Sequence, residues 1–206
     1  MSSKIQYEQL KASGLSFGEP RIHREGERKI GEVIPILYDG DVPVIITGTK
    51  KKGQRSTLFQ DNFGKDKLVL NLDVDSSAAK SYNTICEFVE KKIKSGSLDS
   101  VVEGIKSMHA KVNRVKPLAV KEDKLFIPVT KDTRFFSIDG KEIETIRPSP
   151  SNPVSINGVV GIRISGLYVG PKSVKITLIA EIVMIGPKQV SEKIANLIDF
   201  IDDLTI

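Results

Sequence analysis

The 206-residue sequence has no tryptophan, one cysteine and two histidines. A single cysteine, Cys86, excludes an internal disulfide and is typical of a reducing compartment. His23 and His109 lie far apart, and no ligand pair has zinc spacing. The sequence contains no run of about 18 apolar residues, and residues 1–5 contain no apolar signal core, so neither a membrane span nor a signal peptide is expected. We therefore expect an intracellular protein without a metal or other cofactor.

Charges of both signs are present, but their distribution along the chain is uneven. The net charge of the chain is +5. The last 18 residues carry one lysine against four carboxylates, a net of −3, which leaves +8 on the other 188 residues. A basic body favours polyanions such as nucleic acid or anionic lipid, and a surface that merely keeps the protein soluble is the alternative.

The stretch from Val154 to Ile185 predicts one long β-hairpin with its turn at 170–172. Its second arm becomes apolar on both faces, which indicates a central strand. Its first arm carries three glycines that are typical of bulges or sharp bends: Gly158, Gly161 and Gly166.

Further strands are predicted at 33–38, 42–47, 67–74, 124–129, 134–138 and 141–146, with Asp-Gly turns at 39–40 and 139–140. Between them the hydrophobic period becomes helical. One helix spans Tyr82 to Ile93 and ends at Gly96, and a second runs from Ser97 to Met108. Cys86 lies on the apolar stripe of the first helix, where a small buried residue is expected.

This order predicts an α+β fold whose mostly antiparallel sheet closes into a small β-barrel. We divide the chain into an N-terminal arm at 1–31, a β-barrel domain at 32–188 with a two-helix insertion at about 80–112, and an acidic amphipathic C-terminal tail at 189–206. The tail is either a helix docked on the body or a contact for another protein.

Enzyme motifs are weak. Residues 48–56 have the two glycines of a phosphate-binding loop but hold Gln54 and Arg55 where that loop needs lysine and serine or threonine. Asp73 and Asp75 would share a face of a strand and could hold Mg²⁺ in a nuclease, although a solvated strand end is the simpler interpretation. We therefore expect no enzyme activity.

Cations and aromatic rings coincide three times on the β portion. Single-strand binders need cations for phosphates and rings on which bases stack. With eight phenylalanines and four tyrosines in the chain, several rings are also needed in the core. The candidate nucleic-acid-binding residues are Lys50, Lys51, Lys52, Arg55, Phe59, Phe63, Lys65, Arg134, Phe136, Arg163, Tyr168, Lys172 and Lys175.

The chain end, Asp199 to Ile206, resembles the acidic, hydrophobic-ended tip of bacterial and phage single-stranded DNA-binding proteins. The layout, with an early strand pair, a helical section and a closing hairpin containing Tyr168 before Gly170, resembles OB-fold single-stranded DNA-binding proteins of large DNA viruses. The resemblance implies an OB-like barrel, and a tail that recruits replication proteins through Asp199, Phe200, Asp202, Asp203 and Ile206.

We therefore expect sequence-independent single-stranded DNA binding in replication or recombination. The expected partners are single-stranded nucleic acid, DNA in preference, a replication protein at the tail, and a second copy of the chain, without a membrane. The resemblance places the protein in the cytoplasm or nucleus of a host cell, or in a virion. The alternative is a viral structural or assembly protein that uses the β-domain for subunit contacts.

Overall fold

The computed structural model describes residues 3–6, 9–48, 56–73, 75–98, 124–137, 139–144, 146–149, 151–170 and 173–186. Within them the chain forms one α-helix, a short 3-10 turn and thirteen strands. In chain order these are β1 (Ser3–Gln6), η1 (Ala12–Gly14), β2 (Leu15–Phe17), β3 (Arg21–Glu25), β4 (Arg28–Ile34), β5 (Ile36–Tyr38), β6 (Val42–Gly48), β7 (Ser56–Gln60), β8 (Asp66–Asn71), α1 (Ser77–Lys94), β9 (Lys124–Ser137), β10 (Glu142–Ile143), β11 (Val154–Ile156), β12 (Gly158–Gly170) and β13 (Ser173–Ile185).

The predicted long hairpin is confirmed from Gly158 to Ile185 and forms the centre of the sheet, whereas Val154–Ile156, expected in its first arm, form the separate strand β11 that pairs with β7. β12 and β13 pair from Gly158 opposite Ile185 to Gly170 opposite Ser173, with register shifts at 161–162 and 164–166. At the second shift Gly166 has φ of 148°, and a Cβ atom there would lie 2.5 Å from the carbonyl oxygen of Ile34. This bend therefore requires glycine.

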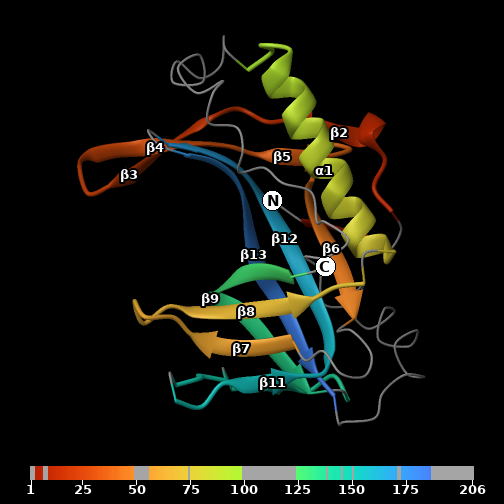
Figure 1. The fold of residues 1–206 in the computed structure, drawn as a ribbon, viewed down its shortest axis with the longest axis vertical. Helices are drawn as coiled ribbons and strands as arrows, with labels where there is room; N and C mark the ends of the chain where they lie inside the picture. Colours follow the sequence, from red (N-terminus) through yellow and green to blue (C-terminus); the bar gives the residue numbers. More distant parts are fainter. Residues whose placement is uncertain are drawn as a thin grey trace.

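Eleven strands belong to one sheet, in the order β1-β6-β12-β13-β9-β8-β7-β11, with β4 paired to β12, β3 to β4 and β10 to β9. β9 connects two parts of this sheet, because its first half pairs antiparallel with β8 and its second half pairs parallel with β13. β7, β8 and the start of β9 consequently cross in front of the central hairpin (Figure 1). The core between these layers contains Leu68, Ile127 and Ile164, all fully buried.

The predicted β-barrel is wrong, because the sheet stays open. β1 and β11 end the order of strands, and no pairing among the described strands joins them. The reason lies in β9, which passes from one layer to the other and makes the sheet double back instead of closing. Residue alternation reveals a strand but does not reveal that its two halves have different partners.

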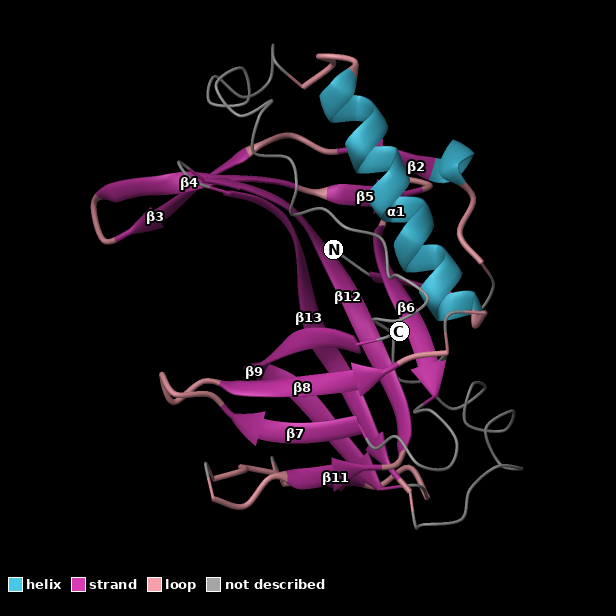
Figure 2. Ribbon diagram, in the orientation of Figure 1, coloured by secondary structure: helices cyan, strands magenta, loops and turns pink. Residues whose placement is uncertain are grey.

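The first predicted helix is confirmed as α1. The side chain of Ser76 caps it by accepting from the backbone N–H of Ala79 at 3.2 Å, and Gly96 follows its end with φ of 69°. Cys86 is fully buried, and the ring of Phe88 packs on Phe17 of β2 at 5.1 Å. Figure 2 shows α1 lying across β2 and β5 at one end of the molecule.

The two-helix insertion is also wrong for the part of the chain that the structure describes. α1 is the one α-helix there, and its apolar stripe packs on the N-terminal strands and η1. Of the second predicted helix, residues 97–98 lie in the turn after α1 and residues 99–108 lie outside the described residues, as does the tail at 189–206. No helix in the described ranges is long and apolar enough to cross a membrane.

The segment expected to be an N-terminal arm contributes to the sheets. β1 pairs parallel with β6, and β2 pairs with β5. β3 pairs with β4, and the inner end of β4 pairs with β12 through Glu32, Val33 and Ile34. β1, β2 and β3 have at most five residues each, and β3 is exposed throughout, so they carry little alternation from which to predict them.

Candidate nucleic-acid interface

A groove of about 750 Å³ lies where the end of β7, the start of β8 and the middle of β9 meet the first residues of β13. Five cationic side chains line it: Lys65, Lys67, Lys131, Arg147 and Lys175. One carboxylate, Asp66, also lines it. Cations gathered in a concave surface focus a positive potential that attracts polyanions. The groove is thus a basic surface built from β7, β8, β9, β13 and two loops, and β7 is a strand that the sequence did not predict.

The turn between β7 and β8 is organised by Asp61. Its carboxylate accepts from the backbone N–H groups of Phe63 and Lys65, both at 2.9 Å, and pairs with the Lys67 ammonium at 2.5 Å. These interactions, led by the Lys67 hydrogen bond, lower the pKa of Asp61 to about 2. The turn presents Phe63 with 86% of its surface exposed, beside the exposed Lys65.

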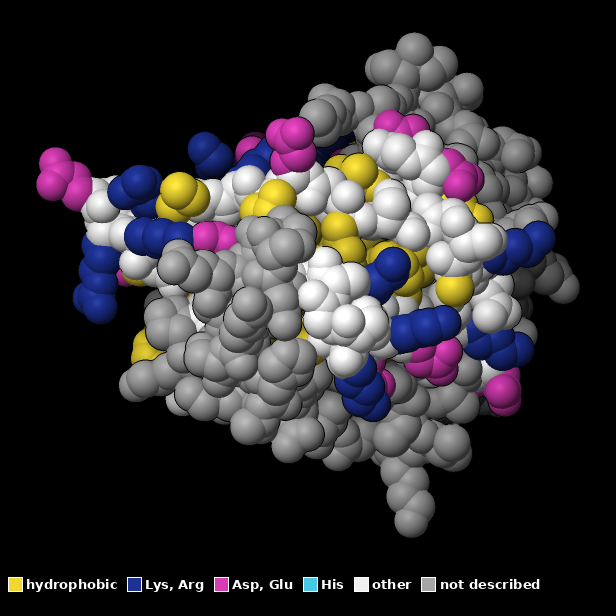
Figure 3. All heavy atoms as spheres, turned by 90° about the horizontal axis from the view of Figure 1, so that it is seen from above, with side chains coloured by type: hydrophobic (Ala, Val, Ile, Leu, Met, Phe, Trp, Pro, Cys, Tyr) yellow, Lys and Arg dark blue, Asp and Glu magenta, His cyan; other side chains and the backbone are white. Residues whose placement is uncertain are grey.

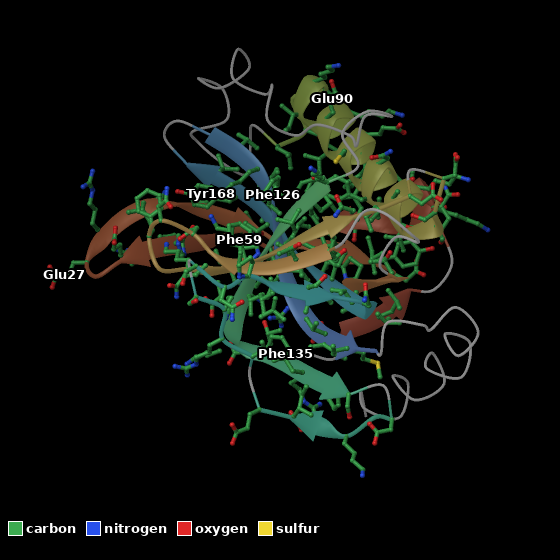
Figure 4. All side chains as sticks on the ribbon, turned by 60° about the horizontal axis from the view of Figure 1, so that its bottom comes forward. Glu27, Phe59, Glu90, Phe126, Phe135 and Tyr168 are labelled. Carbon is green, nitrogen blue, oxygen red and sulfur yellow. The ribbon has the colours of Figure 1, made fainter. Side chains whose placement is uncertain are left out.

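Beside the groove, β7, β8 and β9 present an outer face that we define as Thr57, Phe59, Lys67, Val69, Phe126 and Pro128. Cross-strand pairing aligns Phe59 with Lys67 and Pro128, and aligns Thr57 with Val69 and Phe126. Phe126 is 61% exposed. The alternating residues Leu68 and Ile127 point into the core. Phe59 and Phe126 therefore lie on one sheet face, at a distance from the buried Phe135 (Figure 4).

Tyr168 joins the groove to β4. Its hydroxyl donates to the backbone oxygen of Ile30 at 2.8 Å, and the Lys175 ammonium lies 5.3 Å from its ring centroid. Tyr168 is half-buried, while Lys175 is exposed and lines the groove. The structure thus brings together the predicted pair of Tyr168 and Lys175. The ring positions the lysine through a cation–π contact.

Arg134 and Phe136 do not join this surface. Phe136 is 1% exposed, so its ring offers no face to a base. The Arg134 guanidinium donates twice to the carboxylate of Glu142, at 3.1 and 3.0 Å, and lies 4.9 Å from the Phe136 ring. This pairing lowers the pKa of Glu142. Phe136 is therefore part of the core and Arg134 is paired with Glu142, so neither is placed to contact a nucleic acid.

Arg163 belongs to a polar cluster in the bend of the central hairpin. It is half-buried opposite Ile179 and Val44, away from the groove residues. Its Nε, the Ser165 hydroxyl and one Glu181 carboxylate oxygen are buried without a hydrogen-bond partner in the described structure. Burial raises the pKa of Glu181, which the charge of Arg163 partly opposes.

The remaining candidates are placed as follows. Lys50, Lys51, Lys52, Arg55, Lys172 and the tail residues Asp199, Phe200, Asp202, Asp203 and Ile206 lie outside the described residues. The Asp73 carboxylate accepts from the backbone N–H of Asp75 at 3.1 Å in the turn before α1. No group of three or more potential metal ligands occurs within the described ranges.

Sequence reasoning missed Phe126 and Arg147. Phe126 could have been found, because the strand predicted at 124–129 alternates and puts Leu125 and Ile127 opposite it. Arg147 follows a predicted hairpin in a proline-containing loop, and no periodicity places such a residue in space.

Comparison of the chain with protein-family models, curated proteins and solved structures finds no match. The functional assignment consequently rests on the basic groove and the outer face beside it.

Proposed function

We propose that this protein binds single-stranded nucleic acid without base-sequence preference. The observation that carries the proposal is the groove, in which five cations line one surface next to the exposed Phe63 and Phe126. DNA is the preferred ligand on the basis of the resemblance of the tail to those of single-stranded DNA-binding proteins, and replication or recombination is the proposed setting.

The groove would hold the phosphates. Lys131, Arg147 and Lys175 are exposed. Neutralisation of phosphates by such side chains releases counterions, so the affinity should fall steeply with salt. Lys67 is already paired with Asp61, and it contributes less free charge than the other groove cations.

The outer face would receive the bases. Aromatic side chains on an open sheet face stack on two or three unpaired bases, and every base has a π-face, so stacking needs no particular sequence. Phe126 and Phe59 lie on that face, and Phe63 stands at its edge in the β7–β8 turn. In a duplex the bases are already stacked on one another, so this arrangement favours single strands.

The test is fluorescence anisotropy with a labelled poly-dT of about 30 nucleotides, long enough to exceed one single-strand site. Lys131→Gln, Arg147→Gln and Lys175→Gln are combined in one variant. Three exposed lysines of α1 supply the matched control, with Lys80→Gln, Lys91→Gln and Lys94→Gln combined.

Each lost phosphate contact lowers the magnitude of the slope of log affinity against log salt by about 0.7. Loss of three contacts should therefore lower the affinity of the groove variant by about 100-fold at about 0.1 M salt. The control variant should bind like wild type. Wild-type protein that does not bind at about 50 mM salt, or a groove variant that binds like its control, would contradict the proposal.

A second function is favoured by the apolar character of the outer face. Val69, Phe126 and Pro128 form a partly exposed apolar area that could equally contact a second subunit of a viral structural or assembly protein. Such an interface persists in high salt, because apolar burial is not screened. Light scattering at low and high salt decides this point, since a salt-resistant oligomer that Phe126→Glu dissociates would favour assembly.

A further inference from the structure

The β3–β4 hairpin projects from the body of the protein. All five residues of β3 are exposed. The first part of β4, residues 28–31, pairs with β3 alone among the described strands. Figure 3 shows this hairpin extending from one side with lysine and arginine side chains along it, and Glu27 marks its tip in Figure 4. A two-stranded ribbon that buries so little is only marginally stable by itself, so its contacts at the root and the charges along it need an explanation.

The root of the hairpin is fixed to the groove. A Cβ atom on Gly31 would lie 2.6 Å from the Val169 carbonyl oxygen and 2.8 Å from the Tyr168 ring, so the two strands approach closely here. The Tyr168 hydroxyl holds the Ile30 carbonyl, and the ring of His23 meets that of Tyr168 edge-on at 5.9 Å. The direction in which the hairpin leaves the body is therefore set by packing.

One cross-strand row connects the hairpin to the groove. Arg21 pairs with Val33, Val33 with Tyr168, and Tyr168 with Lys175, which lines the groove. Directly opposite residues share a sheet face. The face of the hairpin that carries Arg21 is thus continuous with the groove.

The two faces of the hairpin differ in whether their cations already have partners within the protein. The register shift between β3 and β4 leaves its extra residue on β4, so the side chains of β3 alternate regularly. Glu25, and Arg28 directly across from it, therefore lie on the same face as Arg21. Neither guanidinium, of Arg21 or of Arg28, has an ion pair or hydrogen bond in the described structure. On the opposite face Lys29 pairs with Glu32 at 2.5 Å, and Arg24 donates to the backbone oxygen of Glu27.

We propose that the β3–β4 hairpin is an arm that extends the nucleic-acid path beyond the groove, with Arg21 and Arg28 contacting phosphates of the strand that the groove holds. This inference rests on the proposed single-strand binding. The predicted consequence is a longer site, in which a short oligonucleotide occupies the groove and a long one occupies the groove and the arm.

The test compares Arg21→Gln with Arg28→Gln, combined, against Arg24→Gln with Lys29→Gln, combined. Both variants remove two cations from the same hairpin, but from opposite faces. Affinity is measured for poly-dT of about 8 and about 30 nucleotides over a series of salt concentrations, and the mass of each variant is measured by light scattering.

For the longer strand, loss of two contacts should lower the salt slope by about 1.4 and the affinity by about 25-fold at about 0.1 M salt, with the opposite-face control near wild type. Binding of the shorter strand should be unchanged by either pair. Equal effects of the two variants, or equal losses on the two strands, would overturn the arm while leaving the groove in place. A change of mass in the Arg21/Arg28 variant would assign this face to a second copy of the chain. Failure of wild-type protein to bind either strand would instead remove the proposed function.

Discussion

Phe126 provides the sharpest test of base stacking on the outer face. Its side chain is 61% exposed, so Phe126→Ala removes little buried area and should leave the fold intact. Truncation of a fully buried phenylalanine costs about 3–5 kcal/mol of folding free energy, and a side chain with most of its surface in water should cost well under half of that. A loss of binding can therefore be separated from a loss of structure by measuring the melting temperature of each variant.

The expected loss of affinity follows from stacking energies. Base–aromatic stacking is worth about 1–3 kcal/mol per base, which corresponds to about 5- to 150-fold in the dissociation constant. Phe126→Trp should retain binding, because a larger ring still stacks. Binding of duplex DNA should be unaffected, so the preference for single strands should fall by the same factor.

The control for Phe126→Ala is Ile22→Ala, which truncates another large exposed apolar side chain, 54% exposed on β3, away from the outer face. It should bind like wild type. Unchanged affinity of Phe126→Ala, in a protein whose groove variant does lose binding, would refute stacking at this position and leave only phosphate contacts.

Three further predictions concern stability. Tyr168→Phe removes the hydrogen bond to Ile30 and should lower the free energy of unfolding by about 0.5–1.5 kcal/mol in urea titrations; no change would show that this hydrogen bond does not stabilise the hairpin root. Asp61 has a pKa of about 2 against an ordinary 3.8, so its stabilisation is present above the ordinary value and is lost as pH falls through that window. Asp61→Asn should flatten the pH dependence of unfolding there, and an unchanged slope would contradict its role in the turn. Burial raises the pKa of Glu181, so the fold favours its neutral form and loses stability as pH rises through that pKa. Glu181→Gln should therefore stabilise the protein near neutral pH and have little effect below pH 4.5, which urea titrations at both pH values would check.

The sequence predicts well where local rules act. The alternation along 154–185, with its glycines, gives the central hairpin, and the spacing from Tyr82 to Gly96 gives most of α1. It fails where distant segments choose partners. Nothing in residues 124–137 indicates that this strand pairs with β8 at one end and β13 at the other, and the barrel prediction failed for that reason.

The candidate site divides in the same way. In the sequence Phe126 and Phe136 both have the pattern of alternating strand residues. The first half of β9 has one solvated face, which exposes Phe126, whereas the second half buries both Phe135 and Phe136. Lys65 and Lys175 were predicted and both line the groove, since each lies near a turn of a correctly predicted strand. Their neighbour Arg147 comes from a loop whose path depends on the whole fold.

The position of the central hairpin has a consequence for how the chain folds. β12 and β13 lie between β6 and β9 in the sheet, yet they follow both in the sequence. During synthesis the edge of β6 that pairs with β12 and the edge of β9 that pairs with β13 therefore stay unpaired until residues near 185 leave the ribosome. The hairpin closes over a short loop and should form first, after which the two older strands dock on either side of it. A chain truncated before β13 would therefore leave exposed strand edges that favour aggregation.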